Sequence, residues 1–367
     1  MSKLVPFRSV LIFGGAGFIG SNWAHFLLKN SDARIHIFDN LSRNGVSRNL
    51  EWLKEEAGDS GRLKITIGDV RDAALVKRAV QGAAEIYHFA AQVAVTTSVD
   101  DPRFDFEVNV GGTLNILEAA RISGRHPFLL FTSTNKVYGK LGSLRLEKRP
   151  KRYCAIDDLG VNESQPLDFY SPYGCSKGAA DQYVRDYSRM FGIPTVVFRM
   201  SCIAGPHQCG NEDQGWVAHF LYSAMLGRPV TIYGDGRQVR DVLYVGDLVE
   251  AFDKVRSQLE KTAGNVYNVG GGLSNSVSLL EIIEDIERVA GTRFCYEMEA
   301  ARPGDQLYYV TDHAKLTRDT GWAPKVSLRR ALEKMHAWSK ENRRAPEGVS
   351  ASAGVAGAAP QVTEAVS

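Results

Sequence analysis

"SVLIFGGAGFIGSNWAHFLLKN", residues 9–30, carries the pattern that decides the fold. A continuous apolar run, 9–13, predicts a buried strand, and the apolar residues of 17–30 recur at helical spacing. Between them, the glycines of 14–20 form G-x-x-G-x-x-G, or G-x-G-x-x-G counted from Gly15. Such a turn lets a pyrophosphate approach the backbone at the amino end of a helix. The stretch therefore predicts a dinucleotide site on the first strand of a parallel sheet.

Strand-like runs and helical patterns alternate through the first half of the chain. Further strands are predicted at 34–38, 63–67, 85–89, 128–133 and 195–200, with helices near 101–123 and from Ser171. Because the crossovers between parallel strands must cover the sheet, this alternation predicts an α/β fold, a doubly wound parallel sheet of the Rossmann type. The less regular pattern after residue 200, with a helix at 277–290, predicts a smaller interleaved C-terminal α/β substrate lobe.

These patterns suggest two domains and a tail. The expected dinucleotide-binding domain is 1–199 with parts of 237–270, and the expected substrate-binding lobe is 200–236 with 271–343. Residues 344–367 are mostly Ala, Gly, Ser and Pro with few large apolar side chains. Such a segment cannot bury enough apolar surface to offset its ordering entropy, so a disordered tail is expected.

The composition excludes several function classes. The net charge of +2 is too small to indicate a nucleic-acid partner. No apolar run reaches the roughly 18 residues of a transmembrane helix, and the N-terminus lacks a signal-peptide cleavage pattern. The five cysteines form no C-x-x-C motif and the eight histidines lack ligand spacing, so no metal site is expected. We expect a cytoplasmic protein with reduced thiols and no membrane association.

An acidic residue supports the dinucleotide prediction. Asp39 ends the second strand about 20 residues after the glycine turn, where it can bind the adenosine ribose and repel a 2′-phosphate, which favours NAD over NADP. "GDV" at 68–70 is expected to flank the adenine, and "HFAAQ" at 88–92 is expected to pass beneath the cofactor. The residues expected to bind NAD are Gly14, Gly17, Phe18, Ile19, Gly20, Asp39, Asn40, Asp69, Val70, Ala90, Ala91, Gln92, Asn109, Ser133, Tyr173 and Lys177.

"SPYGCSKGAADQY" at 171–183 contains a tyrosine and a lysine four residues apart, Tyr173 and Lys177. With 14 tyrosines in the chain, such a pair is expected about once by chance, so the motif needs its structural context. The two side chains share one helical face, at the sheet edge where the fifth strand ends in Ser133 and Thr134. Either the pair is only a capped helix start with a surface lysine, or it is catalytic.

Taken in order, the glycine turn, Asp39, a Ser/Thr after the fifth strand and Tyr-x-x-x-Lys resemble the extended short-chain dehydrogenase/reductase family, up to about residue 340. The resemblance implies a catalytic set of Thr134, Tyr173 and Lys177. Tyr173 would remove a proton from a sugar hydroxyl while its carbon gives hydride to NAD, and Thr134 would bind the reacting oxygen. Lys177 would hold the nicotinamide ribose and lower the tyrosine pKa: an ammonium roughly 5 Å away contributes about 3 kcal/mol.

Within this family, sequence segments distinguish the possible reactions. Asn135 and Lys136 stand where the family's 4,6-dehydratases carry Asp-Glu, which disfavours dehydration. "HFAAQVAVTTS", "STNKVYG", "DQGWV" and "GDGRQVRDVLY" resemble the CDP-paratose 2-epimerases, also called CDP-tyvelose epimerases. That resemblance implies oxidation at the sugar C2, rotation of the ketone and return of hydride to the other face. The segment from Lys140 to Asp168 suggests an added loop near the substrate.

The same resemblance implies a nucleotide-sugar substrate, with a CDP-hexose favoured, and a homo-oligomer, either a dimer or a tetramer. Guanidinium groups suit phosphate oxygens, and two arginines occupy the family's corresponding motifs. The residues expected to bind substrate are Gln92, Thr134, Ser201, Gln214, Val217, Arg240 and Arg302. A UDP-sugar 4-epimerase, a reductase or decarboxylase on the same scaffold, and a non-catalytic NAD-sensing protein remain as alternatives. The residues alone select neither the nucleobase nor the sugar carbon.

Overall fold

The computed structural model describes residues 9–156, 160–302 and 304–342, so the tail expected at 344–367 lies outside the described residues. A sheet of seven parallel strands is the centre of the fold, in the order β12-β8-β5-β4-β1-β2-β3. Its strands are β1 (Ser9–Phe13), β2 (Arg34–Asp39), β3 (Leu63–Ile67), β4 (Glu85–His88), β5 (Phe128–Thr134), β8 (Thr195–Met200) and β12 (Asn265–Val269). This topology confirms the predicted doubly wound parallel sheet.

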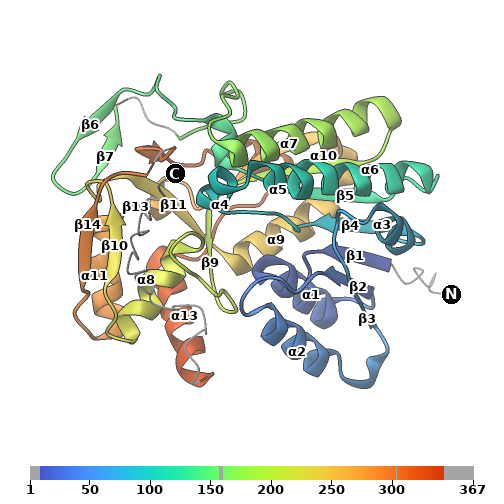
Figure 1. The fold of residues 1–367 in the computed structure, drawn as a ribbon, viewed down its shortest axis with the longest axis horizontal. Helices are drawn as coiled ribbons and strands as arrows, with labels where there is room; N and C mark the ends of the chain where they lie inside the picture. The colour runs from blue at the N-terminus through green and yellow to red at the C-terminus, as the bar shows by residue number, and fades with distance from the viewer. Residues whose placement is uncertain (1–8, 157–159, 303, 343–367) are drawn as a thin grey trace, which may run out of the picture.

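Helices cover both faces of this sheet (Figure 1). One face carries α1 (Phe18–Asn30), α2 (Val46–Ala57) and α9 (Val245–Arg256), and the other carries α3 (Ala73–Val80), α6 (Gly112–Ile122) and α7 (Pro172–Phe191). Buried Trp23 and Phe252 pack in the first layer, and buried Ile116 and Val184 pack in the second. Because the strands are covered on both faces, they consist of nearly continuous apolar residues.

The long helix expected near 101–123 is interrupted in the structure. After α4 (Val95–Asp100), the chain forms α5 (Pro102–Phe106), a wide π-helical turn (Glu107–Gly111) and then α6. Such turns occur frequently at functional sites. This one places Asn109, which is 1% exposed, among buried polar groups beside α7.

A smaller lobe follows the sixth strand and lies beside the carboxyl edge of the sheet (Figure 1). One of its sheets contains β9 (Cys202–Ala204), β11 (Val239–Tyr244), β13 (Ser276–Ser278) and β15 (Tyr308–Tyr309), and the other contains β10 (Val230–Tyr233) and β14 (Tyr296–Glu299). Buried side chains of α8 (Trp216–Met225), α11 (Leu279–Ala290) and α13 (Leu328–Glu341) form the core of the lobe.

Two later segments return to the large sheet. β12 is its last strand, and Leu316 of α12 (Ala314–Thr320) packs with Trp322 in the layer of α1 and α9. The remaining short elements are α10 (Leu259–Thr262) and the 3₁₀ turns η1 (Gly58–Ser60), η3 (Asn135–Tyr138) and η4 (Leu273–Asn275). The domain boundaries expected from the sequence stay a prediction.

The segment from 140 to 168 contains an antiparallel hairpin, β6 (Leu146–Lys148) and β7 (Tyr153–Ala155). The hairpin lies beside the smaller lobe (Figure 1). The Tyr153 hydroxyl donates a 2.9 Å hydrogen bond to Asp235, which anchors the hairpin to the lobe. Within the described ranges, no helix combines the length and apolarity needed to cross a membrane.

Candidate active site

The carboxyl ends of β1, β4 and β5 meet at one edge of the sheet, and α7 begins at this edge. Ser171 caps α7, since its hydroxyl accepts a 3.2 Å hydrogen bond from the Gly174 amide, and Pro172 occupies the first turn. The Tyr173 amide donates to the Ser98 hydroxyl at 3.1 Å. These contacts set the start of the helix, so Tyr173 lies at the sheet edge and is only 8% exposed.

The side chain of Thr134, the last residue of β5, interacts with the Tyr173 phenol and favours its ionised form. Burial raises the pKa of Tyr173 to about 12, and the charge of Asp105 adds to this increase. The Thr134 side chain and the Arg43 charge act in the opposite direction. The protein groups together therefore keep the phenol protonated near neutral pH.

Lys177 lies one helical turn after the tyrosine but faces the strand. Its ammonium donates a 2.7 Å hydrogen bond to the Thr132 oxygen and lies 4.1 Å from the centre of the Phe131 ring. Burial lowers the pKa of Lys177 to about 7, although Asp181 and Asp105 favour the charged form. Arg43 is a cation that lowers the Tyr173 pKa in this structure, and the effect expected of Lys177 stays a prediction.

The glycine turn fits a bound pyrophosphate. Gly14 has φ +74°, and a Cβ there would lie 2.6 Å from the Ala90 nitrogen, while a Cβ at Gly20 would lie 2.3 Å from the Gly14 oxygen. Gly17 precedes α1 and supplies no side-chain cap, so within the described residues no side chain caps the first amides of the helix, at Phe18 and Ile19. An anion suits such amides.

Asp39 holds this turn from the end of β2. Its carboxylate accepts hydrogen bonds from the Ala16 amide at 3.0 Å and the Leu41 amide at 2.9 Å. Desolvation raises the Asp39 pKa despite these bonds. Asn40 lies beside it and donates at 3.4 Å to Asp69 at the end of the neighbouring strand.

A buried polar network lies between the fourth strand and α7. The Gln92 amide donates to Asn109 at 3.0 Å, the Gln92 side chain donates to Asp105 at 2.9 Å, and the Asn109 side chain donates to Ser176 at 3.0 Å. Among the other residues expected at the cofactor, Ala90 and Ala91 are half-buried, Val70 packs in the core, and the Ser133 hydroxyl is buried without a partner in the described part of the chain.

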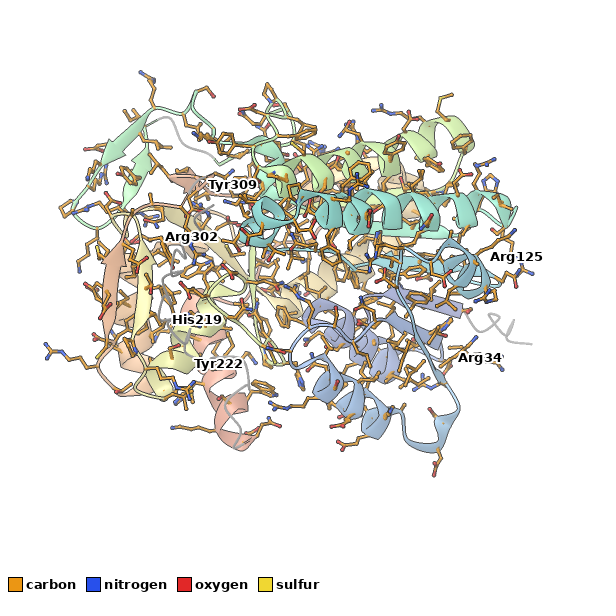
Figure 2. The ribbon with its side chains drawn as sticks, viewed as in Figure 1. Arg34, Arg125, His219, Tyr222, Arg302 and Tyr309 are labelled. Carbon is orange, nitrogen blue, oxygen red and sulfur yellow. The ribbon has the colours of Figure 1, made fainter. Side chains whose placement is uncertain are left out.

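The arginines expected at the diphosphate lie in the lobe. Figure 2 shows Arg302 in the lobe. Arg302 stacks 3.7 Å from the centre of the Tyr233 ring and pairs with Glu212 at 3.1 Å and Asp213 at 3.3 Å. Arg240 donates to the backbone oxygens of Val239 at 2.8 Å and Gln306 at 2.7 Å. Any anion bound by Arg302 must therefore compete with two carboxylates.

Three other expected substrate residues have different environments. The Ser201 hydroxyl donates to the Asp241 backbone oxygen at 2.9 Å, so it is a satisfied hydroxyl. Val217 is 2% exposed in the lobe core, whereas Gln214 is exposed and its amide donates to Asn211 at 2.8 Å. The structure thus brings Thr134, Tyr173 and Lys177 together at one edge of the sheet. Val217, expected at the substrate, is buried and has almost no exposed surface with which to contact one.

Sequence reasoning missed Arg43 and Asp105, and it did not predict the contact between Ser98 and the Tyr173 amide. Arg43 acts electrostatically on Tyr173, Ser98 binds its amide, and Asp105 accepts from both Gln92 and Asn109. None of them lies near Tyr173 in sequence, so no local pattern could indicate the contact.

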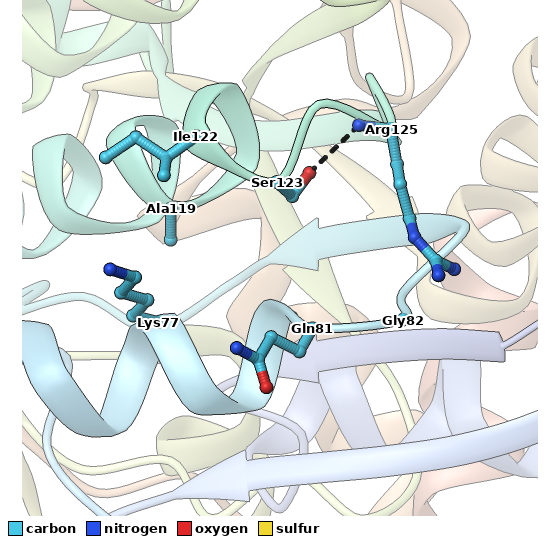
Figure 3. Close-up of a pocket in the computed structure, with 7 residues that line it drawn as sticks. All are labelled: Lys77, Gln81, Gly82, Ala119, Ile122, Ser123 and Arg125. Carbon is cyan, nitrogen blue, oxygen red and sulfur yellow. Dashed lines mark hydrogen bonds between the residues drawn. The ribbon is translucent and has the colours of Figure 1, made fainter.

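A separate cavity of about 420 Å³ lies between α3 and α6 (Figure 3). It is lined by Lys77, Gln81, Gly82, Ala119, Ile122, Ser123 and Arg125. These residues end the helices that precede β4 and β5, so the cavity lies near the amino ends of the strands. It is on the opposite edge of the sheet from Tyr173.

Comparison with known proteins identifies the family. The family model described as GDP-mannose 4,6 dehydratase matches residues 11–335. The chain is 43% identical to CDP-paratose 2-epimerase of Salmonella typhi over 90% of this chain and 98% of that protein. It is 32% identical to dTDP-glucose 4,6-dehydratase of Neisseria meningitidis serogroup B over 92% and 94%.

Solved structures agree with this assignment. A UDP-glucose 4-epimerase of Thermus thermophilus in complex with NAD has a TM-score of 0.75 at 31% identity, over 91% of this chain and 99% of that one. DesIV, a dTDP-glucose 4,6-dehydratase of Streptomyces venezuelae with NAD bound, has a TM-score of 0.79 at 30% identity, over 92% and 98%. The chain belongs to the NAD-dependent epimerase/dehydratase group of the extended short-chain dehydrogenase/reductase family.

Proposed function

We propose that this protein is an NAD-dependent nucleotide-sugar 2-epimerase that converts CDP-paratose to CDP-tyvelose. The observation that carries the proposal is the burial of Tyr173 and Thr134 at the sheet edge that also holds the glycine turn, where Thr134 favours the ionised form of the phenol. The 43% identity to the Salmonella typhi epimerase supports the choice of substrate.

NAD is the proposed cofactor. The uncapped amides of α1 would hold its pyrophosphate, and Asp39 would accept a hydrogen bond from the adenosine ribose. When bound, NAD supplies a hydride acceptor and a positively charged nicotinamide ring. Gly14 and Gly20 let the turn close tightly, because a Cβ at either position would meet backbone atoms of Ala90 or Gly14.

Tyr173 acts as the general base in this proposal. It accepts the proton of the sugar hydroxyl that is oxidised, and it returns the proton when the ketone is reduced on the other face. Thr134 donates a hydrogen bond to the reacting oxygen. Because the protein raises the phenol pKa to about 12, removal of its proton needs additional positive charge beside it, which Arg43 supplies only in part.

Lys177 has a positioning role. Its bond to the Thr132 oxygen fixes the ammonium against β5, and the remaining donors of the ammonium can bind a ribose hydroxyl. Asp105 and Asp181 favour its charged form. The Lys177 ammonium therefore stays fixed in the site as a cation, although burial disfavours its charged form.

The lobe would bind the nucleotide end of the substrate. Arg302 and Arg240 are the proposed diphosphate ligands, and the 211–215 loop carries Glu212 and Asp213 next to Arg302. A homo-oligomer, either a dimer or a tetramer, is also proposed, and α5, α6 and α7 expose the apolar side chains of Phe106, Ile122 and Met190 at 57%, 57% and 68%.

The test is a panel of CDP-hexoses and UDP-hexoses incubated with purified protein and NAD, with product stereochemistry read by NMR. Inversion at C2 of CDP-paratose supports the proposal. Inversion at C4 of a UDP-sugar with unchanged CDP-sugars would replace it with the UDP-sugar 4-epimerase alternative. NAD binding without turnover of any sugar would favour the sensing alternative.

A further inference from the structure

Gln306 is a buried lobe residue that reaches back to the turn after β5. It lies between Arg302 and β15 and is 1% exposed. Its side-chain nitrogen donates a 2.6 Å hydrogen bond to the Gly139 backbone oxygen and lies 3.4 Å from the Asn135 backbone oxygen. Its side-chain oxygen accepts from the Asn135 side-chain nitrogen at 3.4 Å. A lobe residue therefore holds the first residue of η3 and the residue that follows this turn.

The contacts of Gln306 fix the direction of two side-chain amides. A backbone carbonyl only accepts hydrogen bonds, so the Gln306 nitrogen must face Gly139 and its oxygen must face Asn135. The reversed amide would set two oxygens 2.6 Å apart with no proton between them. Asn135 must then turn its nitrogen toward Gln306, and its side-chain oxygen faces the Thr134 hydroxyl.

Thr134 is the end of this chain of amides. Its hydroxyl accepts from the Lys136 backbone amide at 3.2 Å and donates to the Asn135 side-chain oxygen at 3.3 Å. A hydroxyl usually approaches its acceptor to about 2.7–2.8 Å, so the bond to Asn135 is long. A sugar oxygen at the usual distance would therefore compete well for the same proton. The amides orient the Thr134 hydroxyl without holding its proton tightly.

The backbone of Gln306 serves the other end of the site. The Arg240 guanidinium donates a 2.7 Å hydrogen bond to the Gln306 backbone oxygen, and β11, which carries Arg240, pairs in parallel with β15. Arg240 is a proposed diphosphate ligand, so one residue supports both the nucleotide end and the catalytic end of the site. A substitution of the Gln306 side chain leaves its backbone oxygen in place. The two supporting roles can therefore be separated by mutation.

Resting on the proposed function, we propose that Gln306 is a positioning residue for the epimerase reaction. Its buried side chain acts through Asn135, whose amide it orients so that the Thr134 hydroxyl is held ready for the reacting oxygen. The role also explains why an amide stands at position 135, since a carboxylate there could not donate to the Gln306 oxygen. The Gln306 side chain thus contributes to turnover rather than to substrate affinity.

The experiment compares Gln306→Leu and Gln306→Glu with the wild type and with Gln258→Glu. Gln258 is a matched control, because it also donates to a backbone oxygen, that of Thr320 at 3.1 Å, but it lies before α10 at the amino end of β12. We expect Gln306→Leu to lower kcat about 10–100-fold, as loss of buried hydrogen bonds implies, while the KM for CDP-paratose changes less than about threefold. Calorimetry should show nearly unchanged affinity for CDP and NAD.

Gln306→Glu tests the direction of the hydrogen bonds. A protonated carboxyl has one donor for the Gly139 oxygen and one oxygen that accepts from Asn135, whereas a carboxylate only accepts. The ratio of the Gln306→Glu kcat to the wild-type kcat should therefore be highest near about pH 5 and fall as the pH rises, since burial raises the pKa of the new carboxyl above about 4.3. The ratio for Gln258→Glu should stay constant.

A ratio for Gln306→Glu that does not change with pH would overturn the inference, as would a loss of CDP affinity in Gln306→Leu equal to its loss of kcat. Both outcomes leave the epimerase proposal standing. If the wild type turns over no nucleotide sugar, the proposed function fails, and the positioning role fails with it. Urea unfolding still tests the hydrogen bonds in that case: the stability of Gln306→Glu relative to Gln258→Glu should fall as pH rises from about 4.3, because the folded chain holds the added proton more tightly than the unfolded chain.

Discussion

Lys177 donates a 2.7 Å hydrogen bond to the Thr132 backbone oxygen, and this contact anchors α7 to the end of β5. The bond directs the ammonium toward the strand, where it also lies against the Phe131 ring. Thr134 and Arg43 are the groups that lower the pKa of Tyr173 and so favour its ionised form. Tyrosine and lysine thus share a helical face but have different partners.

Tyr173→Phe should lower kcat about 10²–10⁴-fold, since it removes the proposed general base without changing the ring volume. Equilibrium NAD binding, followed by fluorescence, should change little. Tyr183→Phe is the matched control, because Tyr183 is 45% exposed on the same helix. Full turnover by the Tyr173→Phe enzyme would remove the phenol from the mechanism.

Stability should depend on pH through Lys177. Its folded pKa of about 7 lies below the unfolded value of about 10.4, so the unfolded chain binds more protons between these values. The contribution of Lys177 to the free energy of unfolding therefore rises as pH increases from about 7 toward 10. The difference between wild type and Lys177→Met, measured by urea unfolding across this window, should grow in favour of the wild type. A constant difference would contradict the depressed pKa.

Gly20→Ala should weaken NAD binding more than tenfold. The added Cβ would lie 2.3 Å from the Gly14 oxygen, so the turn must shift away from the geometry that receives the pyrophosphate. Gly142→Ala adds a methyl group where no atom lies within 4 Å, and it should leave NAD affinity unchanged. Titration of both variants with NAD tests the turn directly.

Asp181→Asn should destabilise the protein by roughly 3–5 kcal/mol, because it breaks a buried pair and leaves a buried charge. Arg199 donates to both Asp181 oxygens, at 2.8 and 2.9 Å, and the two side chains are 3% and 0% exposed. Asp285→Asn breaks a pair with Arg288, whose side chain is 56% exposed, and should cost less than about 1 kcal/mol. Chemical unfolding of both variants gives the comparison, and equal losses would contradict the argument.

Arg302→Ala should raise the KM for the nucleotide sugar by about 10–100-fold, as expected for lost hydrogen bonds to a charged group. Arg302 must leave Glu212 and Asp213 to bind phosphate, so the increase in KM should fall at the lower end of this range. Arg125→Ala, an exposed arginine at the other end of the molecule (Figure 2), should leave the KM unchanged. An unchanged KM for Arg302→Ala would exclude it as a diphosphate ligand.

Much of the fold was predictable because its signals are local. Apolar runs mark the strands, and the glycines of 14–20 mark a turn that admits no Cβ at Gly14 or Gly20. The interruption of the helix near 101–123 was not predictable, since the wide turn depends on the contacts of Asn109 with Gln92 and Ser176. Val217 was expected at the substrate from a motif, whereas its burial depends on how α8 packs in the lobe.

By itself, the sequence determined the parallel sheet, the glycine turn with Asp39, and the spacing that puts Tyr173 and Lys177 on one helical face. These features follow from backbone sterics and from periodicity over a few residues. Only the tertiary structure decided that Lys177 binds the Thr132 oxygen, that Arg302 pairs with Glu212, and that Lys136 faces Asp305. Such contacts join segments far apart in the chain, and burial sets the cost of their charges, so packing alone fixes them.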